Sequence, residues 1–204
     1  MALIKTNKGQ KLYKKAKKII LGGNMLLSKR PEMFLPDNWP SYFSKSNKIF
    51  VNDIDGNKYT DMICAVGTNI LGYANYDVDK EVIKAINSGI MSTLNSHEEV
   101  ELTKKLLKIH PWADMAKFCR SGGEANAMAV RIARSASVKK NIAICGYHGW
   151  HDWYLAANFK QNQLKNHLLN DLKTIGVHKG LKNTTFTFDY NNTDQLLKLI
   201  KTKK

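Results

Sequence analysis

Residues 115–136 read MAKFCRSGGEANAMAVRIARSA, and the pair of glycines in this stretch separates a strand-like run from a helix-like one. We expect a short buried strand over 115–119. Apolar side chains then recur at helical spacing, which predicts a helix over 124–136. A helix start carries unpaired backbone N–H groups and the positive end of the helix dipole, so bare glycine backbone there favours the close approach of a phosphate. The alternative is an ordinary tight turn in which Ser121 caps the helix.

Strands and helices alternate after this stretch. Residues 141–145, NIAIC, and residues 184–188, TTFTF, are expected to form strands, and residues 193–201 a last helix. A strand, a helix and a strand at this spacing are typical of parallel-sheet units. The second half of the sequence therefore predicts an α/β fold.

The first half of the sequence has a different pattern. The residue pair Asp55-Gly56 lies between two strand-like runs, which predicts a tight hairpin. Two amphipathic helices are expected after it, over 77–90 and 97–109. No internal repeat is visible in either half.

The sequence is strongly basic, with 32 Lys and Arg against 17 Asp and Glu and a formal net charge of +15. Such a charge can indicate a nucleic-acid or membrane-surface partner. Much of the excess lies in the first 31 residues, which contain no acid, and in the last few residues. Around 12–20, lysines surround one apolar helical face, which is typical of a solvated helix rather than a polyanion site, so we expect no nucleic-acid partner. That apolar face consists of Leu12, Ala16, Ile19 and Ile20.

Apolar runs and cysteines indicate the compartment. No apolar run approaches the roughly 20 residues that span a bilayer. The segment IILGGNMLL, residues 19–27, is broken by two glycines and an asparagine, which makes a poor signal-peptide core. Cys64, Cys119 and Cys145 are an odd number and favour buried free thiols over disulfides. We therefore expect a cytoplasmic protein without a membrane partner.

Aromatic and imidazole side chains crowd the segment that follows the strand expected at 141–145. It reads CGYHGWHDW from Cys145 to Trp153. In α/β sheets, ligands bind beyond the carboxyl ends of the strands, where this segment and the glycine pair would both emerge. One offers backbone donors for a phosphate and the other flat side chains for a ring. Two alternatives remain open: a metal site made by Cys145, His148 and His151, and a purely structural aromatic cluster.

Four segments in order carry a likeness to a known family: NDIDGNKYTDM, TNILGYANYDVDKEV, CRSGGEANAMAVRIAR and ICGYHGWHDW. Together they resemble the class III aminotransferases, which are pyridoxal-phosphate (PLP) enzymes of fold type I. Within that class the likeness is greatest to the glutamate-1-semialdehyde 2,1-aminomutases and their aminotransferase relatives. The resemblance implies an N-terminal helix, small-domain hairpin and connecting helices over 1–96. It implies the first part of a large PLP-binding domain, with a mixed, mainly parallel sheet, over 97–204.

The resemblance also implies the cofactor residues. Ser121, Gly122 and Gly123 match the turn that holds the PLP phosphate at a helix start, and Tyr147 matches the aromatic residue that stacks on the pyridine ring. His148 is expected to play a supporting role beside Tyr147. Gly123 stands where the family usually has threonine, so one hydroxyl donor to the phosphate is expected to be missing.

The resemblance implies transfer of an amino group through a PLP Schiff base, between small-molecule amino donors and acceptors, in a homodimer. In the family, the Schiff-base lysine and the carboxylate at the pyridine nitrogen lie beyond the region that this sequence covers. We therefore expect an N-terminal portion with no catalytic residue and no metal ligand of its own. Two other classes remain open: a non-catalytic remnant that acts as an interaction partner, and a basic nucleic-acid-binding protein.

Overall fold

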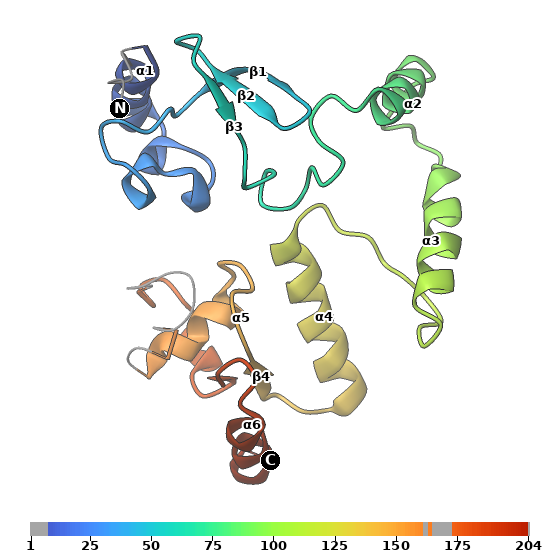
Figure 1. Ribbon diagram of the computed structural model, residues 1–204. Helices are drawn as coiled ribbons and strands as arrows, with labels where there is room; N and C mark the ends of the chain where they lie inside the picture. The colour runs from blue at the N-terminus through green and yellow to red at the C-terminus, as the bar shows by residue number, and fades with distance from the viewer. Residues whose placement is uncertain (1–7, 161–162, 165–172, 204) are drawn as a thin grey trace. The chain divides into compact units, whose positions relative to one another are not determined.

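The computed structural model describes residues 8–160, 163–164 and 173–203 (Figure 1). The chain forms two compact units, one up to residue 96 and one from residue 97 onwards. An antiparallel sheet of three strands lies in the first unit, and a parallel pair of strands lies in the second.

Helix α1 (Lys8–Ile19) packs through one narrow face, made by Gly9, Tyr13 and Ala16. The Tyr13 hydroxyl donates a 2.8 Å hydrogen bond to Glu32, so the segment after α1 covers this face. Of the predicted apolar face, Ala16 is buried, whereas Leu12 and Ile19 are 42% and 83% exposed. The segment that follows forms three 3-10 helices, namely η1 (Leu21–Gly23), η2 (Leu27–Lys29) and η3 (Pro31–Met33).

The predicted hairpin is confirmed. Strands β2 (Phe50–Asp53) and β3 (Lys58–Thr60) pair antiparallel, and β1 (Phe43–Asn47) pairs with the other edge of β2. Asp53 holds the turn, because its buried carboxylate accepts hydrogen bonds from the backbone N–H groups of Asp55 and Asn57 at 2.9 and 2.8 Å. It also accepts one from the Tyr59 hydroxyl at 3.1 Å. Burial, together with this carboxylate, raises the pKa of Tyr59 to about 12.

Helix α2 (Tyr76–Asn87) follows the sheet and confirms the helix predicted near 77–90. Asn75 caps it, because its side chain accepts a 3.2 Å hydrogen bond from the Val78 N–H. Four aliphatic residues of α2 form one stripe, yet each is 47% to 58% exposed. Nothing among the described residues buries this stripe, which consists of Val78, Val82, Ile83 and Ile86.

The second unit contains the α/β part of the chain. Its elements are α3 (Glu98–Ile109), α4 (Gly122–Ser137), β4 (Ile142–Ile144), α5 (Asp152–Leu155), η4 (Ala156–Phe159), η5 (Lys179–Leu181), β5 (Thr185–Thr187) and α6 (Thr193–Thr202). Strands β4 and β5 pair in parallel, with Ala143 opposite Phe186, so the predicted parallel unit is confirmed. The strand predicted over 115–119 is wrong. A strand exists by pairing, and within the described ranges these residues join no ladder and make no backbone hydrogen bond.

The core of the second unit joins β4 to α5. Its buried residues are Ile144, Trp153, Tyr154, Ala157 and Leu164. Ala127 and Val130 of α4 pack against this cluster, which places α4 over it. The Thr185 hydroxyl of β5 donates a buried 2.6 Å hydrogen bond to the Trp153 carbonyl. This bond fixes β5 to α5.

Helix α4 ends at a strained residue. Val138 follows the helix in the left-handed region, with φ 55° and ψ 25°, and its side chain is 90% exposed. Glycine is the usual residue there, because a β-branched side chain crowds the backbone. Val138→Gly is therefore expected to raise the free energy of unfolding by about 1 kcal/mol, measured by urea denaturation. Val138→Ala keeps the Cβ and should give a smaller gain; an equal gain would contradict the role of backbone strain.

The structure tests two expectations from the sequence, namely the state of the cysteines and the lack of a membrane-spanning segment. Cys64, Cys119 and Cys145 are free thiols, as predicted. The prediction that they are buried is wrong, because Cys64 is exposed and the other two are partly exposed. Within the described ranges, no helix has the length and apolar character needed to cross a membrane.

Candidate functional site

The start of α4 presents two backbone N–H groups that have no hydrogen-bond acceptor among the described residues. Ser121 caps the helix, and its hydroxyl oxygen accepts a 3.2 Å hydrogen bond from the Glu124 N–H. The Glu124 carboxylate reaches back and accepts from the Arg120 N–H at 2.9 Å. The N–H groups of Gly122 and Gly123 have no such partner. At the positive end of a helix dipole, these two groups are donors for an anion.

The two glycines differ in their surroundings. A Cβ added to Gly122 would meet no atom of the described residues within 4 Å, so the space that these residues leave beside it is open. A Cβ added to Gly123 would lie 2.8 Å from Nε2 of His151, which is closer than real Cβ atoms approach their neighbours. Glycine at 123 therefore has a packing reason. A threonine there, as the family resemblance leads one to expect, would require His151 to move.

The aromatic segment after β4 meets the start of α4 through Gly149 and His151. Gly149 has φ 103°, and a Cβ added to it would lie 3.2 Å from the Cα of Gly123. The His151 ring stacks on Trp150, with ring centroids 5.2 Å apart and planes 9° apart. The two segments that the sequence predicts to share a crevice therefore touch. Gly149 and His151, which make this contact, were not among the predicted cofactor residues. The sequence feature that could have indicated them is the glycine and the histidine that follow Tyr147 in YHGWH.

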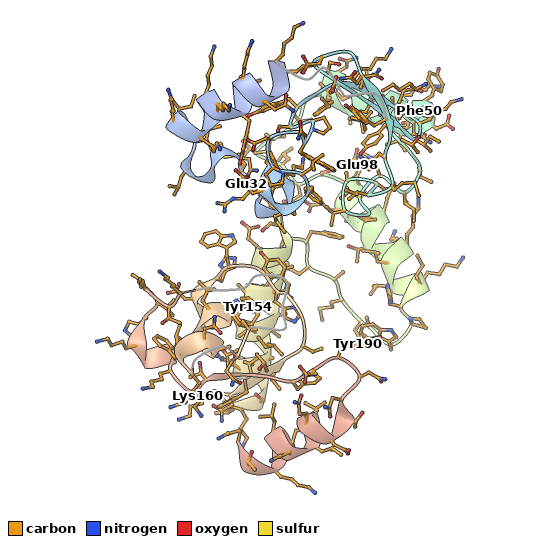
Figure 2. The ribbon with its side chains drawn as sticks, turned by 60° about the vertical axis from the view of Figure 1, so that its left-hand side comes forward. Glu32, Phe50, Glu98, Tyr154, Lys160 and Tyr190 are labelled. Atoms are coloured by element: carbon orange, nitrogen blue, oxygen red, sulfur yellow. The ribbon has the colours of Figure 1, made fainter. Side chains whose placement is uncertain are left out.

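Tyr147 and His148 lie in an aromatic cluster around Tyr154. Tyr154 is labelled in Figure 2. The Tyr147 ring is 43% exposed and meets the Tyr154 ring edge-on, with centroids 5.8 Å apart. Nε2 of His148 lies 2.8 Å from the Cys145 carbonyl oxygen, which anchors its ring. Tyr154 is fully buried, and this burial raises the pKa of its hydroxyl to about 12. Tyr147 therefore combines a supported ring with an exposed surface, whereas Tyr154 is part of the core.

The metal alternative finds no support in the described parts of the chain. No three His, Cys, Asp or Glu side chains gather there as metal ligands would. Cys145, His148 and His151 therefore form no metal-ligand cluster, although the segment that carries them is compact.

Comparison with known proteins decides the family. A profile described as Aminotransferase class-III matches residues 36–202. The chain belongs to the class III aminotransferases. The 3-aminobutyryl-CoA aminotransferase of Cloacimonas acidaminovorans is 32% identical over 202 residues, which are 98% of this chain and 45% of that relative. The glutamate-1-semialdehyde 2,1-aminomutase of Methanocaldococcus jannaschii is 30% identical over 203 residues, which are 98% of this chain and 46% of that relative. This class III chain thus spans less than half the length of these curated relatives.

Solved structures show the same fold. The FumI protein of Sphingopyxis sp. MTA144, solved with PLP, has a TM-score of 0.79 at 25% identity, over 96% of this chain and 44% of that one. A structure described as a transaminase with PLP bound has a TM-score of 0.78 at 25% identity, over 96% and 45%. The glutamate-1-semialdehyde aminomutase of Pseudomonas aeruginosa PAO1 reaches 0.72 at 19% identity, over 95% and 41%. The predicted fold type I is therefore confirmed for this class III chain, over less than half of these structures.

Class III aminotransferases are PLP-dependent, and the start of α4 fits the phosphate of that cofactor. The N–H groups of Gly122 and Gly123 are available as donors, and open space lies beside Gly122. Ser121 adds a hydroxyl at the same turn. The residues present therefore suit a phosphate that is held mainly by backbone.

Proposed function

We propose that this chain forms the phosphate-binding turn and the ring-stacking wall of a PLP-dependent aminotransferase or aminomutase. The observation that carries the proposal is the pair of N–H groups at Gly122 and Gly123, which have no acceptor among residues 8–160, 163–164 and 173–203, with open space beside Gly122. Membership of the class III aminotransferases supports PLP as the ligand.

Three residues bind the phosphate in this proposal. Gly122 and Gly123 donate their N–H groups to phosphate oxygens at the positive end of α4. The Ser121 oxygen already accepts a hydrogen bond from the Glu124 N–H, so its own proton is left to donate to the phosphate. His151 is a positioning residue, because its ring lies against Gly123 and limits movement of the backbone there.

Tyr147 forms the wall against which the pyridine ring stacks. The edge-on contact with Tyr154 fixes the Tyr147 ring, and its exposed surface remains for the cofactor. His148 supports the segment through its contact with the Cys145 carbonyl. When bound, PLP supplies an electron sink for moving an amino group.

The proposed substrates are small-molecule amino donors and acceptors, and the proposed assembly is a homodimer in the cytoplasm. Both an aminotransferase and an aminomutase align with 98% of this chain. We infer that the matched region suits either reaction and that the choice between the two reactions depends on residues outside this region. The Schiff-base lysine is likewise proposed to lie outside residues 1–204, because the matched relatives have more than half their length outside this match.

Binding of 4′-deoxypyridoxine 5′-phosphate tests the proposed site. This PLP analogue has no aldehyde, so it cannot condense with surface lysines. Tyr147→Ala is expected to weaken its binding about fivefold, since loss of a ring stack costs on the order of 1 kcal/mol. Tyr147→Phe keeps the ring and should bind as the wild type does. Isothermal titration calorimetry measures each affinity.

Tyr190→Ala is the matched control for this experiment. Tyr190 lies in the same unit, is 91% exposed and is labelled in Figure 2. Its loss removes a tyrosine ring without touching the proposed wall, so the affinity should not change. Equal affinities for the wild type, Tyr147→Ala and Tyr190→Ala would remove Tyr147 from the cofactor site.

A further inference from the structure

A hollow of about 690 Å³ lies where β4 and β5 begin. Lys140 lies just before the start of β4, and Lys182 lies just before the start of β5. Because the two strands are parallel, their amino ends lie at the same end of the sheet. The Cys145–Trp153 segment leaves β4 at the opposite end, which is the carboxyl end of the strands. Lys160, which directly follows η4, and Lys203, which directly follows α6, also line the hollow. The hollow therefore lies away from the proposed cofactor turn.

The hollow is strongly positive. Its lining includes Lys140, Lys160, Lys182 and Lys203 and contains no Asp or Glu. None of these four lysines forms an ion pair within the described ranges. The C-terminal end of α6 adds only about half a negative charge from its dipole, which is small against four full positive charges. A ligand that fits this surface carries several negative charges.

Two phenylalanine rings give the same hollow an apolar part. Phe159 and Phe186 are both partly buried in its lining. Nζ of Lys160 lies 5.7 Å from the centre of the Phe186 ring, and Nζ of Lys203 lies 5.3 Å from it (Lys160 is labelled in Figure 2). A ring with cations around it suits a ligand that joins a flat ring to anionic groups.

The position of Lys203 is fixed by the fold. The Asn141 side-chain amide donates a 2.7 Å hydrogen bond to the Lys203 carbonyl and so joins the entrance of β4 to the end of α6. The Lys203 N–H in turn donates to the Leu199 carbonyl at 2.9 Å. The backbone that carries Lys203 is therefore held at the hollow, and only its side chain needs to move to meet a ligand.

We propose that this basic hollow binds a nucleotide, with its phosphates on the lysines and its base against Phe186. Phosphate contacts from lysine and stacking of a base on an aromatic ring are the two elements by which proteins hold nucleotides. The volume lies within the range of about 300–1,000 Å³ that is typical of small-molecule sites. A single nucleotide is of the size of ligand that such volumes hold, so the proposed ligand is a free nucleotide.

Calorimetric titration of the full chain with ATP tests the proposal. Lys203→Glu is expected to weaken ATP binding by at least about tenfold, because it replaces an attraction to phosphate by a repulsion. Phe186→Leu is expected to weaken ATP binding about fivefold and to leave the binding of inorganic tripolyphosphate unchanged, because only ATP has a base to stack. Circular dichroism spectra should show that both variants keep the wild-type fold.

Lys104→Glu is the matched control, since it makes the same charge change at an exposed residue of α3 outside the hollow. Its ATP affinity should stay within about twofold of the wild type. A thymidine oligonucleotide that binds more tightly than ATP, and loses affinity in the same two variants, would support the phosphate-and-base chemistry and assign it to single strands. Absence of ATP binding, an equal loss in Lys104→Glu, or an unchanged ATP affinity in Phe186→Leu would overturn the proposal.

Discussion

Gly122→Asp is expected to weaken binding of 4′-deoxypyridoxine 5′-phosphate by at least about tenfold while slightly raising the stability of the protein. The new carboxylate would lie beside the N–H groups that hold the phosphate, where two charges about 5 Å apart repel by about 3 kcal/mol at an effective dielectric constant near 20. Without ligand, a carboxylate at the start of α4 is favourable by about 0.5 kcal/mol, because it interacts with the helix dipole. No atom of the described residues lies within 4 Å of the added Cβ, so the Cβ itself creates no clash.

The opposite signs of these two effects make the Gly122→Asp experiment decisive. Calorimetry measures the affinity, and thermal unfolding without ligand measures the stability. Gly122→Asn is the matched control, because asparagine has nearly the shape of aspartate without its charge. A loss of affinity in Gly122→Asn as large as in Gly122→Asp would show that bulk, and not repulsion, is responsible. Unchanged affinity in both variants would remove the α4 turn from the cofactor site.

Tyr154→Ala is expected to lower the free energy of unfolding of the second unit by about 3–5 kcal/mol, the usual cost of truncating a buried aromatic residue. Tyr154 is fully buried at the centre of the core cluster. Its ring lies 5.9 Å from the Trp153 ring and 5.8 Å from the Tyr147 ring, centre to centre. The cavity left by alanine would therefore loosen both the core and the proposed ring wall. Urea denaturation followed by tryptophan fluorescence measures the change.

Tyr154→Phe separates the ring of Tyr154 from its hydroxyl. The hydroxyl donates a long 3.5 Å hydrogen bond to the Gly146 carbonyl, so its removal is expected to cost only about 1 kcal/mol. A destabilisation by Tyr154→Phe as large as that by Tyr154→Ala would mean that polar contacts, rather than packing of the ring, hold this core together.

Helix positions could be predicted from sequence because their signals are local. Apolar spacing placed α2 and α4 to within a few residues, and Ser121 was recognised from sequence as a possible cap of α4. The segments with which a strand or helix packs are distant in sequence, and the prediction of these packing partners failed. The strand expected over 115–119 joins no ladder in the part of the chain that the structure describes. The polar run of β1 (Phe43–Asn47) gave no alternating signal, although β1 pairs with β2. Amphipathic spacing likewise predicts a helix such as α2 but not the surface that covers its apolar stripe.

In the candidate site, too, the local features could be predicted from sequence and the contacts between distant segments could not. The glycine pair and the aromatic segment could be recognised from residue types, and their meeting followed from the expected α/β sheet. The contact of Gly123 with Gly149 and His151 could not be predicted, because a close backbone approach depends on loop geometry that residue types do not specify. The roles of Ser121, Tyr147 and His148 in binding PLP stay predictions until the affinities are measured.

The pairing of β4 with β5 has a consequence for how the protein is made. Ile142 of β4 pairs with Thr185 of β5, and the buried hydrogen bond from the Thr185 hydroxyl to the Trp153 carbonyl also requires β5. Helix α4, in contrast, depends mainly on contacts between neighbours in sequence. Because the N-terminal part of a chain emerges first during synthesis and non-local pairing is slow, α4 can form on the ribosome while Trp153 and Tyr154 still lack the strand that completes their packing. During that interval we expect the newly made chain to expose the aromatic side chains of Trp153 and Tyr154.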